Sequence, residues 1–289
     1  MKPKILVIGS PLAVISQAEW VLFSSRYEVI EYAFATHDDF ISSMKSGECF
    51  TIDGIMRVGI NLPSGAVKIG QGWTRKFLDC FPPSLRVIVN FGHGFEQEDI
   101  EGLASRSIKF YNTTGGAEAT ATIGIYLIIS AFRKLSIYER MVRNNEFLPA
   151  LRDSAHSSRD PCGKSLGIVG MGVIGQVVAK QVAALNMQIH CLNRKSSRET
   201  LNDSKTQLPP MTLHDTLESL LQVVDCVILT CSYSKSTHHL LGNEAFFKMK
   251  PGMVVVNIAR GKCIDEEALC RALETGVVSA AGLDVYENE

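Results

Sequence analysis

The segment Gly170-Met171-Gly172-Val173-Ile174-Gly175 constrains the fold of this chain more than any other. It directly follows the apolar run 166–169, which is typical of a buried strand, and it opens the apolar-periodic segment 173–185, which is typical of a helix. A G-x-G-x-x-G string alone is weak evidence, but a preceding strand and a following helix are the context in which it has a mechanism. The segment therefore predicts a phosphate-binding loop between a strand and a helix.

Each glycine has a separate task in such a loop. Gly170 permits the tight turn, Gly172 lets the backbone reach a pyrophosphate, and Gly175 lets the helix and the strand pack closely. The first helical residues, Val173 and Ile174, then offer unpaired N–H groups and the positive end of the helix dipole to the anion. The alternative is that the three glycines serve tight packing only. We predict a dinucleotide site.

Short apolar strands alternate with helical segments along the whole chain, which predicts βαβ units and mostly parallel sheets. The expected strands are residues 5–8, 29–32, 54–58, 87–91, 109–111, 166–169, 188–192, 226–229, 253–257 and 279–283. The expected helices are 38–44, 73–81, 117–135, 173–185, 217–223 and 266–273. Turn-forming residues at 112–116 suggest a hinge. We therefore expect two Rossmann-like α/β domains, 1–114 and 115–289.

Composition limits the classes of partner and compartment. The 289 residues are 46% hydrophobic and 20% charged with a net charge of −1, so a disordered chain, nucleic-acid binding and binding to an anionic membrane are all unexpected. The apolar run 5–8 is too short for a signal peptide or a membrane span. The eight cysteines form no C-x-x-C pair and no metal cluster, and Cys191, Cys226 and Cys231 resemble buried free thiols. We expect no metal and a reducing, cytoplasmic location.

The segment 117–135 is apolar almost all round, with small residues near its start. A helix without a polar face must be buried on every side. Burial between the two domains, or in the interface of a homodimer, would satisfy this requirement, and we expect both.

The residues after the second strand of the dinucleotide-binding unit indicate which cofactor is bound. An acidic residue about twenty positions after the glycines would accept the 2′-OH of NAD. Here Asn193 takes that place, and Arg194, Lys195 and Ser196 follow it. A guanidinium binds a 2′-phosphate with charge-assisted hydrogen bonds, so we predict NADP(H) over NAD(H). The alternative is that Arg194 and Lys195 are ordinary surface charges.

Several further segments resemble the D-isomer-specific 2-hydroxyacid dehydrogenase family. They are Val256-Asn257-Ile258-Ala259-Arg260-Gly261, residues 265–269, residues 282–289, Gly92-His93-Gly94-Phe95 and Asn112-Thr113-Thr114-Gly115. Together they cover essentially the whole chain. Details at 36–38, 154–156 and 233–240 are similar to the fungal D-mandelate dehydrogenase and glyoxylate/hydroxypyruvate reductase type. The resemblance implies a flavodoxin-like substrate-binding domain at 1–114, lacking its C-terminal part, and an NAD(P)-binding Rossmann domain at 115–289.

The resemblance also implies roles for particular residues. Arg260 would bind the substrate carboxylate and polarise its 2-oxo group, and the backbone N–H groups of His93 and Gly94 would hold the carboxylate. Asp284 would contact the nicotinamide carboxamide, and Glu289 would orient a catalytic histidine and raise its pKa. Further cofactor contacts are expected at Thr120, Cys231, Ser232, Thr237, Ile258, Ala259 and Arg260. The implied activity is NADP(H)-dependent interconversion of a small 2-oxo acid and a D-2-hydroxy acid by hydride transfer.

One departure from the family pattern concerns the proton donor. The family's catalytic histidine follows the acid matched by Glu289, and none of the seven histidines here has a matching context. We therefore expect impaired catalysis and extra exposed apolar surface on the first domain. The alternatives are a non-catalytic dinucleotide-sensing or scaffold module, and a fragment without function. Retention of Arg260 and Glu289 favours the enzyme, and the missing histidine favours the module.

Overall fold

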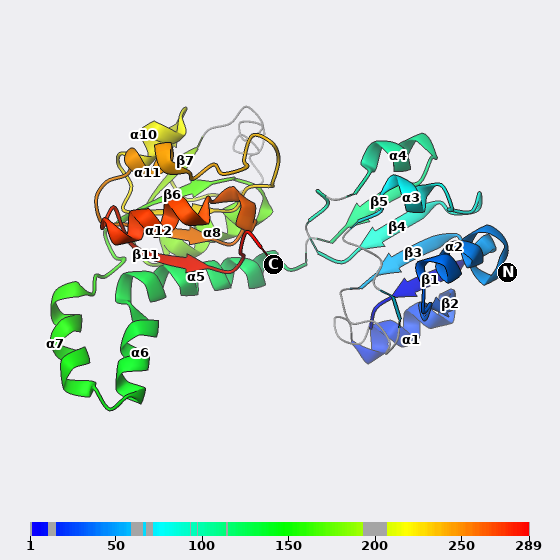
Figure 1. Ribbon diagram of the computed structural model, residues 1–289, viewed down its shortest axis with the longest axis horizontal. Helices are drawn as coiled ribbons and strands as arrows, with labels where there is room; N and C mark the ends of the chain where they lie inside the picture. Colours follow the sequence, from blue (N-terminus) through cyan, green and yellow to red (C-terminus); the bar gives the residue numbers. More distant parts are fainter. Residues whose placement is uncertain are drawn as a thin grey trace. The chain divides into compact units, whose positions relative to one another are not determined.

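The structure is a computed structural model that describes residues 2–10, 16–58, 66–67, 72–92, 94–96, 98–113, 115–192 and 207–288. The chain divides into two compact units, Met1–Gly116 (unit 1) and Ala117–Glu289 (unit 2) (Figure 1). Each unit is built on one sheet whose paired strands are all parallel. The predicted α/β fold with two parallel sheets is confirmed.

Unit 1 has the flavodoxin-like strand order β2-β1-β3-β4-β5. Its strands are β1 (Lys4–Ile8), β2 (Glu28–Glu31), β3 (Gly54–Arg57), β4 (Val87–Asn90) and β5 (Lys109–Asn112). Its helices are α1 (Gln17–Arg26), α2 (His37–Ser46), η2 (Glu48–Thr51), α3 (Arg75–Leu78) and α4 (Ile100–Ser105). Helix α1 was not predicted, and the expected helix 73–81 is a single turn. The larger core cluster gathers aromatic side chains around the central strands, including Tyr32, Phe40, Trp73 and Phe77.

Unit 2 has the strand order β11-β10-β9-β6-β7-β8, which is the Rossmann order with β6 as its first strand. The strands are β6 (Ser165–Val169), β7 (Gln188–Leu192), β8 (Thr212–His214), β9 (Cys226–Leu229), β10 (Met253–Asn257) and β11 (Val278–Leu283). The helices are α5 (Ala117–Arg133), α6 (Leu135–Arg143), α7 (Phe147–Ser157), α8 (Val173–Ala183), α10 (Leu217–Leu221), α11 (Asn243–Phe247), η3 (Gly261–Cys263) and α12 (Glu266–Glu274). The strand order reverses between β6 and β9, and ligands of such sheets bind at this switch point.

Polar side chains determine where helices begin in both units. Thr36 and Asp39 form a capping box that opens α2, and Asp265 accepts a hydrogen bond from the Ala268 N–H to open α12. At α10 the cap is Thr216. Thr216 has the extended backbone of a cap and accepts from the Ser219 N–H at 3.1 Å.

Helix α5 is buried on one side within unit 2. Within unit 2 it buries one face against the sheet, where a Cβ at Gly124 would lie 2.9 Å from the Ile258 Cδ1 atom. Ile123 and Tyr126 on the other side are 42% and 54% exposed. Unit 2 by itself therefore covers one side of α5, and the expected burial of the other side between the domains or in a homodimer stays a prediction.

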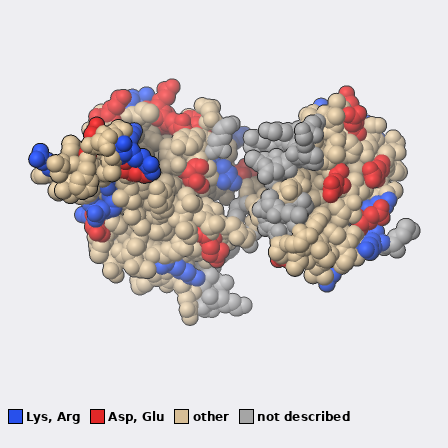
Figure 2. All heavy atoms as spheres, turned by 90° about the horizontal axis from the view of Figure 1, so that it is seen from below, with Lys and Arg blue, Asp and Glu red and all other residues tan. Residues whose placement is uncertain are grey.

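Helices α6 and α7 form a hairpin that projects from unit 2 (Figure 1). Neither helix was predicted from the sequence. None of the described helices alone is long and apolar enough to cross a bilayer; α5 and α6 qualify only as a pair, which is bent by 67°. On the face shown in Figure 2, basic and acidic side chains are interspersed.

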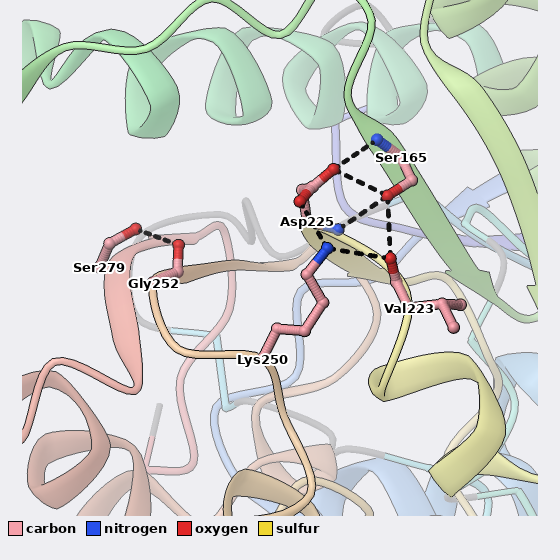
Figure 3. Close-up of polar contacts among 6 residues, drawn as sticks. All are labelled: Ser165, Val223, Asp225, Lys250, Gly252 and Ser279. Atoms are coloured by element: carbon pink, nitrogen blue, oxygen red, sulfur yellow. Dashed lines mark hydrogen bonds and ion pairs between the residues drawn. The ribbon is translucent and has the colours of Figure 1, made fainter.

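A polar network joins strands β6 and β9 at their amino ends (Figure 3). Asp225 accepts hydrogen bonds from the Ser165 N–H at 2.9 Å and the Ser165 hydroxyl at 2.8 Å. The Lys250 ammonium donates to the other carboxylate oxygen at 2.8 Å and to the Val223 carbonyl at 3.1 Å. Burial raises the pKa of Asp225, but the Lys250 and Ser165 hydrogen bonds outweigh it and hold that pKa at about 2.

We predict that Asp225→Asn destabilises the protein at neutral pH and not at acid pH. A depressed carboxyl pKa adds stability above pH about 4, and this stability is lost as the pH falls towards 2. Because about a third of the side chain is exposed, we expect a loss of about 1 kcal/mol at pH 7, or roughly 2–4 °C in Tm. Thermal unfolding followed by circular dichroism at pH 7 and pH 2 measures this.

Asp79→Asn is the matched control, because the ion pair of Asp79 with Arg106 lies on the surface and contributes little. A gap between wild type and Asp225→Asn that stays constant from pH 7 to pH 2 would contradict the assignment.

Candidate active site

The glycine loop has the geometry that a bound phosphate requires. Gly170 has φ +112°, and a Cβ on it would lie 2.6 Å from the backbone nitrogen of Cys231. A Cβ on Gly175 would overlap the Gly170 carbonyl. A Cβ on Gly172 would meet nothing within 4 Å. Gly170 and Gly175 therefore make close backbone packing possible, and the open side of Gly172 leaves the backbone accessible to a ligand.

The N-terminus of α8 follows this loop, with Gly172 at the capping position. Its first internal hydrogen bond runs from the Gln176 N–H to the Gly172 carbonyl at 3.0 Å. The N–H groups of Val173, Ile174 and Gly175 consequently have no acceptor within the helix. Together with the helix dipole they can hold a pyrophosphate, so the residues present fit a dinucleotide.

The residues that follow β9 form hydrogen bonds with the glycine loop and the strand before it. The Thr230 N–H donates to the Val169 carbonyl at 3.0 Å, and the Thr230 hydroxyl donates to the Gly170 carbonyl at 2.5 Å. Further along, Thr237 is buried, and its hydroxyl donates to the Ser232 carbonyl at 2.9 Å and accepts from the Ser234 N–H at 2.7 Å. The Thr237 hydroxyl thus shapes this segment, whereas Ser232 is exposed.

Arg260 follows β10 at the same edge of the sheet. The side chain of Asn257, 1% exposed, accepts from the Ala259 N–H and donates to the Arg260 carbonyl, both at 2.9 Å. The Arg260 guanidinium, half-buried, donates to the Ala259 carbonyl at 2.7 Å. The side chains of Ile258 and Ala259 lie in the core, so a cofactor can meet these two residues mainly through their backbone.

No role for Asn257 was predicted from the sequence. The signal was a single polar residue that ends a strand of otherwise apolar residues, just before the expected substrate arginine. Because the turn is irregular, some of its backbone groups have no backbone hydrogen-bond partner. The Asn257 side chain supplies these hydrogen bonds and so orients the Arg260 backbone.

The segment after β11 is held against the Arg260 loop. The Asp284 N–H donates to the Asn257 carbonyl at 3.0 Å, which continues the β10–β11 pairing. The Glu287 N–H donates to the Glu266 carboxylate at 2.7 Å, and the His239 Nε2 atom lies 2.6 Å from a Glu287 carboxylate oxygen. The contact between His239 and Glu287 joins residues 48 positions apart and was not predicted from the sequence.

Unit 1 contains its own candidate loop after β4. Gly92 has φ +110°, and its N–H donates to the Thr113 hydroxyl at 2.9 Å. Glu98, whose side chain is 5% exposed, accepts from the Trp73 N–H at 2.6 Å and the Asn90 side-chain amide at 2.7 Å. Burial raises the pKa of Glu98, although these bonds oppose the rise. The loop that carries Gly94 is therefore anchored at both ends.

The expected site residues differ in how they are placed. Gly170, Gly172, Gly175, Cys231, Arg260 and Asp284 all follow strands or open α8 at the carboxyl edge of the unit 2 sheet. Thr120 lies half-buried on α5, one turn before Gly124. His93, Asn193, Arg194, Lys195, Ser196 and Glu289 lie outside the described residues. Within the described parts of the chain, no group of three or more His, Cys, Asp or Glu side chains could hold a metal ion.

Comparison with known proteins assigns the family. Residues 125–289 match the family model of the D-isomer specific 2-hydroxyacid dehydrogenase, NAD binding domain. The chain is 34% identical over 288 residues to 4-methyl-2-oxopentanoate reductase A of Aspergillus oryzae, covering 99% of this chain and 82% of that protein. The holo form of Rhodotorula graminis D-mandelate dehydrogenase is 30% identical, with a TM-score of 0.86 over 100% of this chain and 82% of that one.

A third relative is the NADPH-dependent glyoxylate/hydroxypyruvate reductase of Sinorhizobium meliloti, solved with NADP and malonate. It is 27% identical with a TM-score of 0.74, covering 100% of this chain and 81% of that one. This chain belongs to the D-isomer-specific 2-hydroxyacid dehydrogenases, a family of oxidoreductases with an NAD-binding Rossmann domain. The resemblance identified from the sequence motifs is confirmed.

Proposed function

We propose that this chain reduces a 2-oxo acid to a D-2-hydroxy acid and prefers NADP(H) as the cofactor. The observation that carries the proposal is the arginine loop, which Asn257 holds at the end of β10, on the same sheet edge as the glycine loop. An arginine fixed beside a dinucleotide-binding loop suits a small anionic substrate that must meet the cofactor.

Each site residue of unit 2 is proposed to have a separate role in the reaction. The Arg260 guanidinium, a permanent cation with a planar fork, binds the carboxylate and draws electron density from the 2-oxo oxygen. Asp284 contacts the carboxamide end of the cofactor, and Glu289 is the acid that in the family pattern orients the proton-donating histidine. None of the seven histidines of the sequence has a matching context, so we expect turnover by this chain to be impaired. A bound nicotinamide cofactor supplies the hydride. From unit 1, the backbone N–H groups of His93 and Gly94 hold the carboxylate.

The substrate side chain is proposed to be bulky and apolar. Phe91 and Phe95 flank the glycine-rich loop of unit 1 and are 47% and 46% exposed, which is unusual for phenylalanine. The names of two relatives, a 4-methyl-2-oxopentanoate reductase and a D-mandelate dehydrogenase, also describe acids with branched or aromatic side chains.

The cofactor preference depends on the residues that follow β7. Strand β7 pairs in parallel with β6, with Cys191 opposite Ile168, so the chain leaves β7 at the edge where the glycine loop begins. Asn193, Arg194, Lys195 and Ser196 come next and contain no carboxylate that would repel a 2′-phosphate. The NADPH-dependent relative shows that this preference occurs in similar proteins.

Arg260→Ala tests the enzymatic function. We expect NADPH affinity to change less than about twofold, whereas turnover of phenylglyoxylate or 4-methyl-2-oxopentanoate, and binding of oxamate to the NADPH complex, should fall by at least about tenfold. The reason is the loss of a charge-assisted contact of about 1.5–3 kcal/mol. Steady-state kinetics and fluorescence titration measure both quantities.

Arg271→Ala on the exposed face of α12 is the control and should behave as wild type. Two results would contradict the proposed reductase function. One is that oxamate binding and turnover both survive Arg260→Ala, and the other is that the wild type uses no 2-oxo acid and binds no oxamate. In either case, a non-catalytic dinucleotide-binding module would be the better assignment.

Fluorescence titration of the chain with NADPH and NADH tests the cofactor preference. One contact to the 2′-phosphate predicts at least about tenfold tighter NADPH binding, and Arg194→Ala should remove that preference while leaving NADH affinity unchanged. Arg152→Ala on α7 is the control. Tighter NADH binding by the wild type would overturn the preference and leave the family assignment intact.

We also propose a homodimer that pairs through α5, extended by the α6–α7 hairpin. The described residues of α6 include none that is buried, and those of α7 bury only Ala150. Phe147, Leu148 and Leu151 are each more than half exposed, as is Tyr126 on α5. An apolar surface of this kind is typical of an interface, and a two-fold pair of identical chains is the commonest soluble assembly.

The double substitution Tyr126→Glu with Leu148→Glu should convert the dimer to a monomer, because it buries charge in the proposed interface. Sedimentation velocity at micromolar concentration gives the mass of the species. Phe247→Glu, at an apolar residue that is 85% exposed elsewhere on unit 2, is the control and should remain dimeric. A monomeric wild type would refute the interface.

A further inference from the structure

One buried carboxylate closes the loop that follows β4. Asn90 is the last residue of β4, and Glu98 lies eight positions later, after the part of the loop that carries Gly94. The Asn90 side-chain amide donates to one Glu98 carboxylate oxygen at 2.7 Å. The Trp73 backbone N–H donates to the other oxygen at 2.6 Å. Both carboxylate oxygens therefore hold backbone or side chains of unit 1 together, and the Glu98 side chain is only 5% exposed.

Glu98 is held at this place at an energetic cost. A buried carboxylate loses hydration, and burial raises the pKa of Glu98 for that reason. The Arg57 guanidinium, 3.8 Å from the carboxylate, compensates part of this cost. Asn90 turns its amide nitrogen towards Glu98, which leaves its buried Oδ1 atom without a hydrogen-bond partner among the described residues. Local costs of this kind persist mainly at functional sites, which indicates a role for Glu98 beyond packing.

The anchored loop leaves the Gly94 N–H group available to a ligand. The Gly92 N–H donates to the Thr113 hydroxyl at 2.9 Å. The Glu98 N–H donates to the Phe95 carbonyl at 3.0 Å. The Gly94 N–H donates to none of the described residues, and Gly94 is half-buried. A free N–H group on an anchored loop at the carboxyl end of a strand is suited to an anionic ligand.

We propose that Glu98 is a positioning residue for the substrate, because its hydrogen bonds to Asn90 and Trp73 fix the loop whose Gly94 N–H holds the substrate carboxylate. Glu98 does not touch the substrate and acts through the loop. A loop that is fixed before the ligand arrives loses less conformational freedom on binding, so the affinity is higher. This inference rests on the proposed function, which supplies the anionic substrate.

Two substitutions of Glu98 separate its hydrogen bonds from its charge. In Glu98→Gln, the new side-chain carbonyl can accept from the Trp73 N–H, and the new amide can donate to the Asn90 oxygen after the Asn90 amide turns over. This variant therefore keeps both hydrogen bonds and gives the Asn90 Oδ1 atom a partner. Glu98→Ala removes both hydrogen bonds, so the loop should be held only by its backbone contacts.

The experiment titrates the NADPH complex of the 289-residue chain with oxamate, followed by fluorescence. In Glu98→Ala the Kd for oxamate should rise by at least about tenfold, and the Kd for NADPH should change by less than about twofold. In Glu98→Gln the Kd for oxamate should stay within about threefold of wild type, because the loop remains fixed. Hydrogen exchange should be faster in segment 91–98 of Glu98→Ala and unchanged in Glu98→Gln. Glu101→Gln, at an exposed glutamate on α4, is the control and should behave as wild type.

Glu98→Leu is the second variant should the alanine chain fail to fold, because an apolar side chain often replaces a buried charge without loss of stability. It should weaken oxamate binding as Glu98→Ala does. Wild-type oxamate affinity in these two variants, or unchanged exchange in segment 91–98, would overturn the role of Glu98. Equal losses in Glu98→Gln and Glu98→Ala would overturn it as well, since the charge and not the hydrogen bonds would then be responsible. A wild type that binds NADPH but no oxamate would refute the proposed function, and the role of Glu98 with it.

Discussion

The contact between the turn after β6 and the chain leaving β9 is the constraint on which unit 2 depends. At the switch point of a Rossmann sheet, the glycine loop must cross directly above the end of the neighbouring strand. Gly170 meets this demand with a positive φ and no side chain, and Thr230 donates to its carbonyl. Because the turn is compressed, α8 begins close to the sheet and directs its free N–H groups towards the edge where Arg260 and Asp284 lie.

Buried polar side chains hold the loops that carry the expected site residues in place. Asn257 orients the turn that carries Arg260, and Glu98 anchors the loop that carries Gly94. Irregular backbone leaves donors and acceptors that neither helix nor strand satisfies, and an unsatisfied buried group costs about 1–3 kcal/mol. The same groups that satisfy the backbone therefore also define where the site residues point.

The sequence predicted best those elements that are buried on both faces. Strands β9 and β10 were predicted with their observed bounds because such strands are nearly continuous apolar runs. Helices α1 and α6 were missed, and neither contains, among its described residues, a buried residue that would tie it to a core. Edge strand β8 was missed because it is short and partly exposed. The glycine loop and Arg260 were found because their signals are local, whereas the His239–Glu287 contact joins distant segments.

The sequence alone determined the fold class, the glycine loop and the family, because strand–loop–helix periodicity and short motifs are encoded in neighbouring residues. The one-sided burial of α5 was decided only by tertiary structure, since composition cannot show which face meets a sheet. The contact between His239 and Glu287 was decided there as well. Both depend on packing between segments that are far apart along the chain, which no local sequence pattern shows.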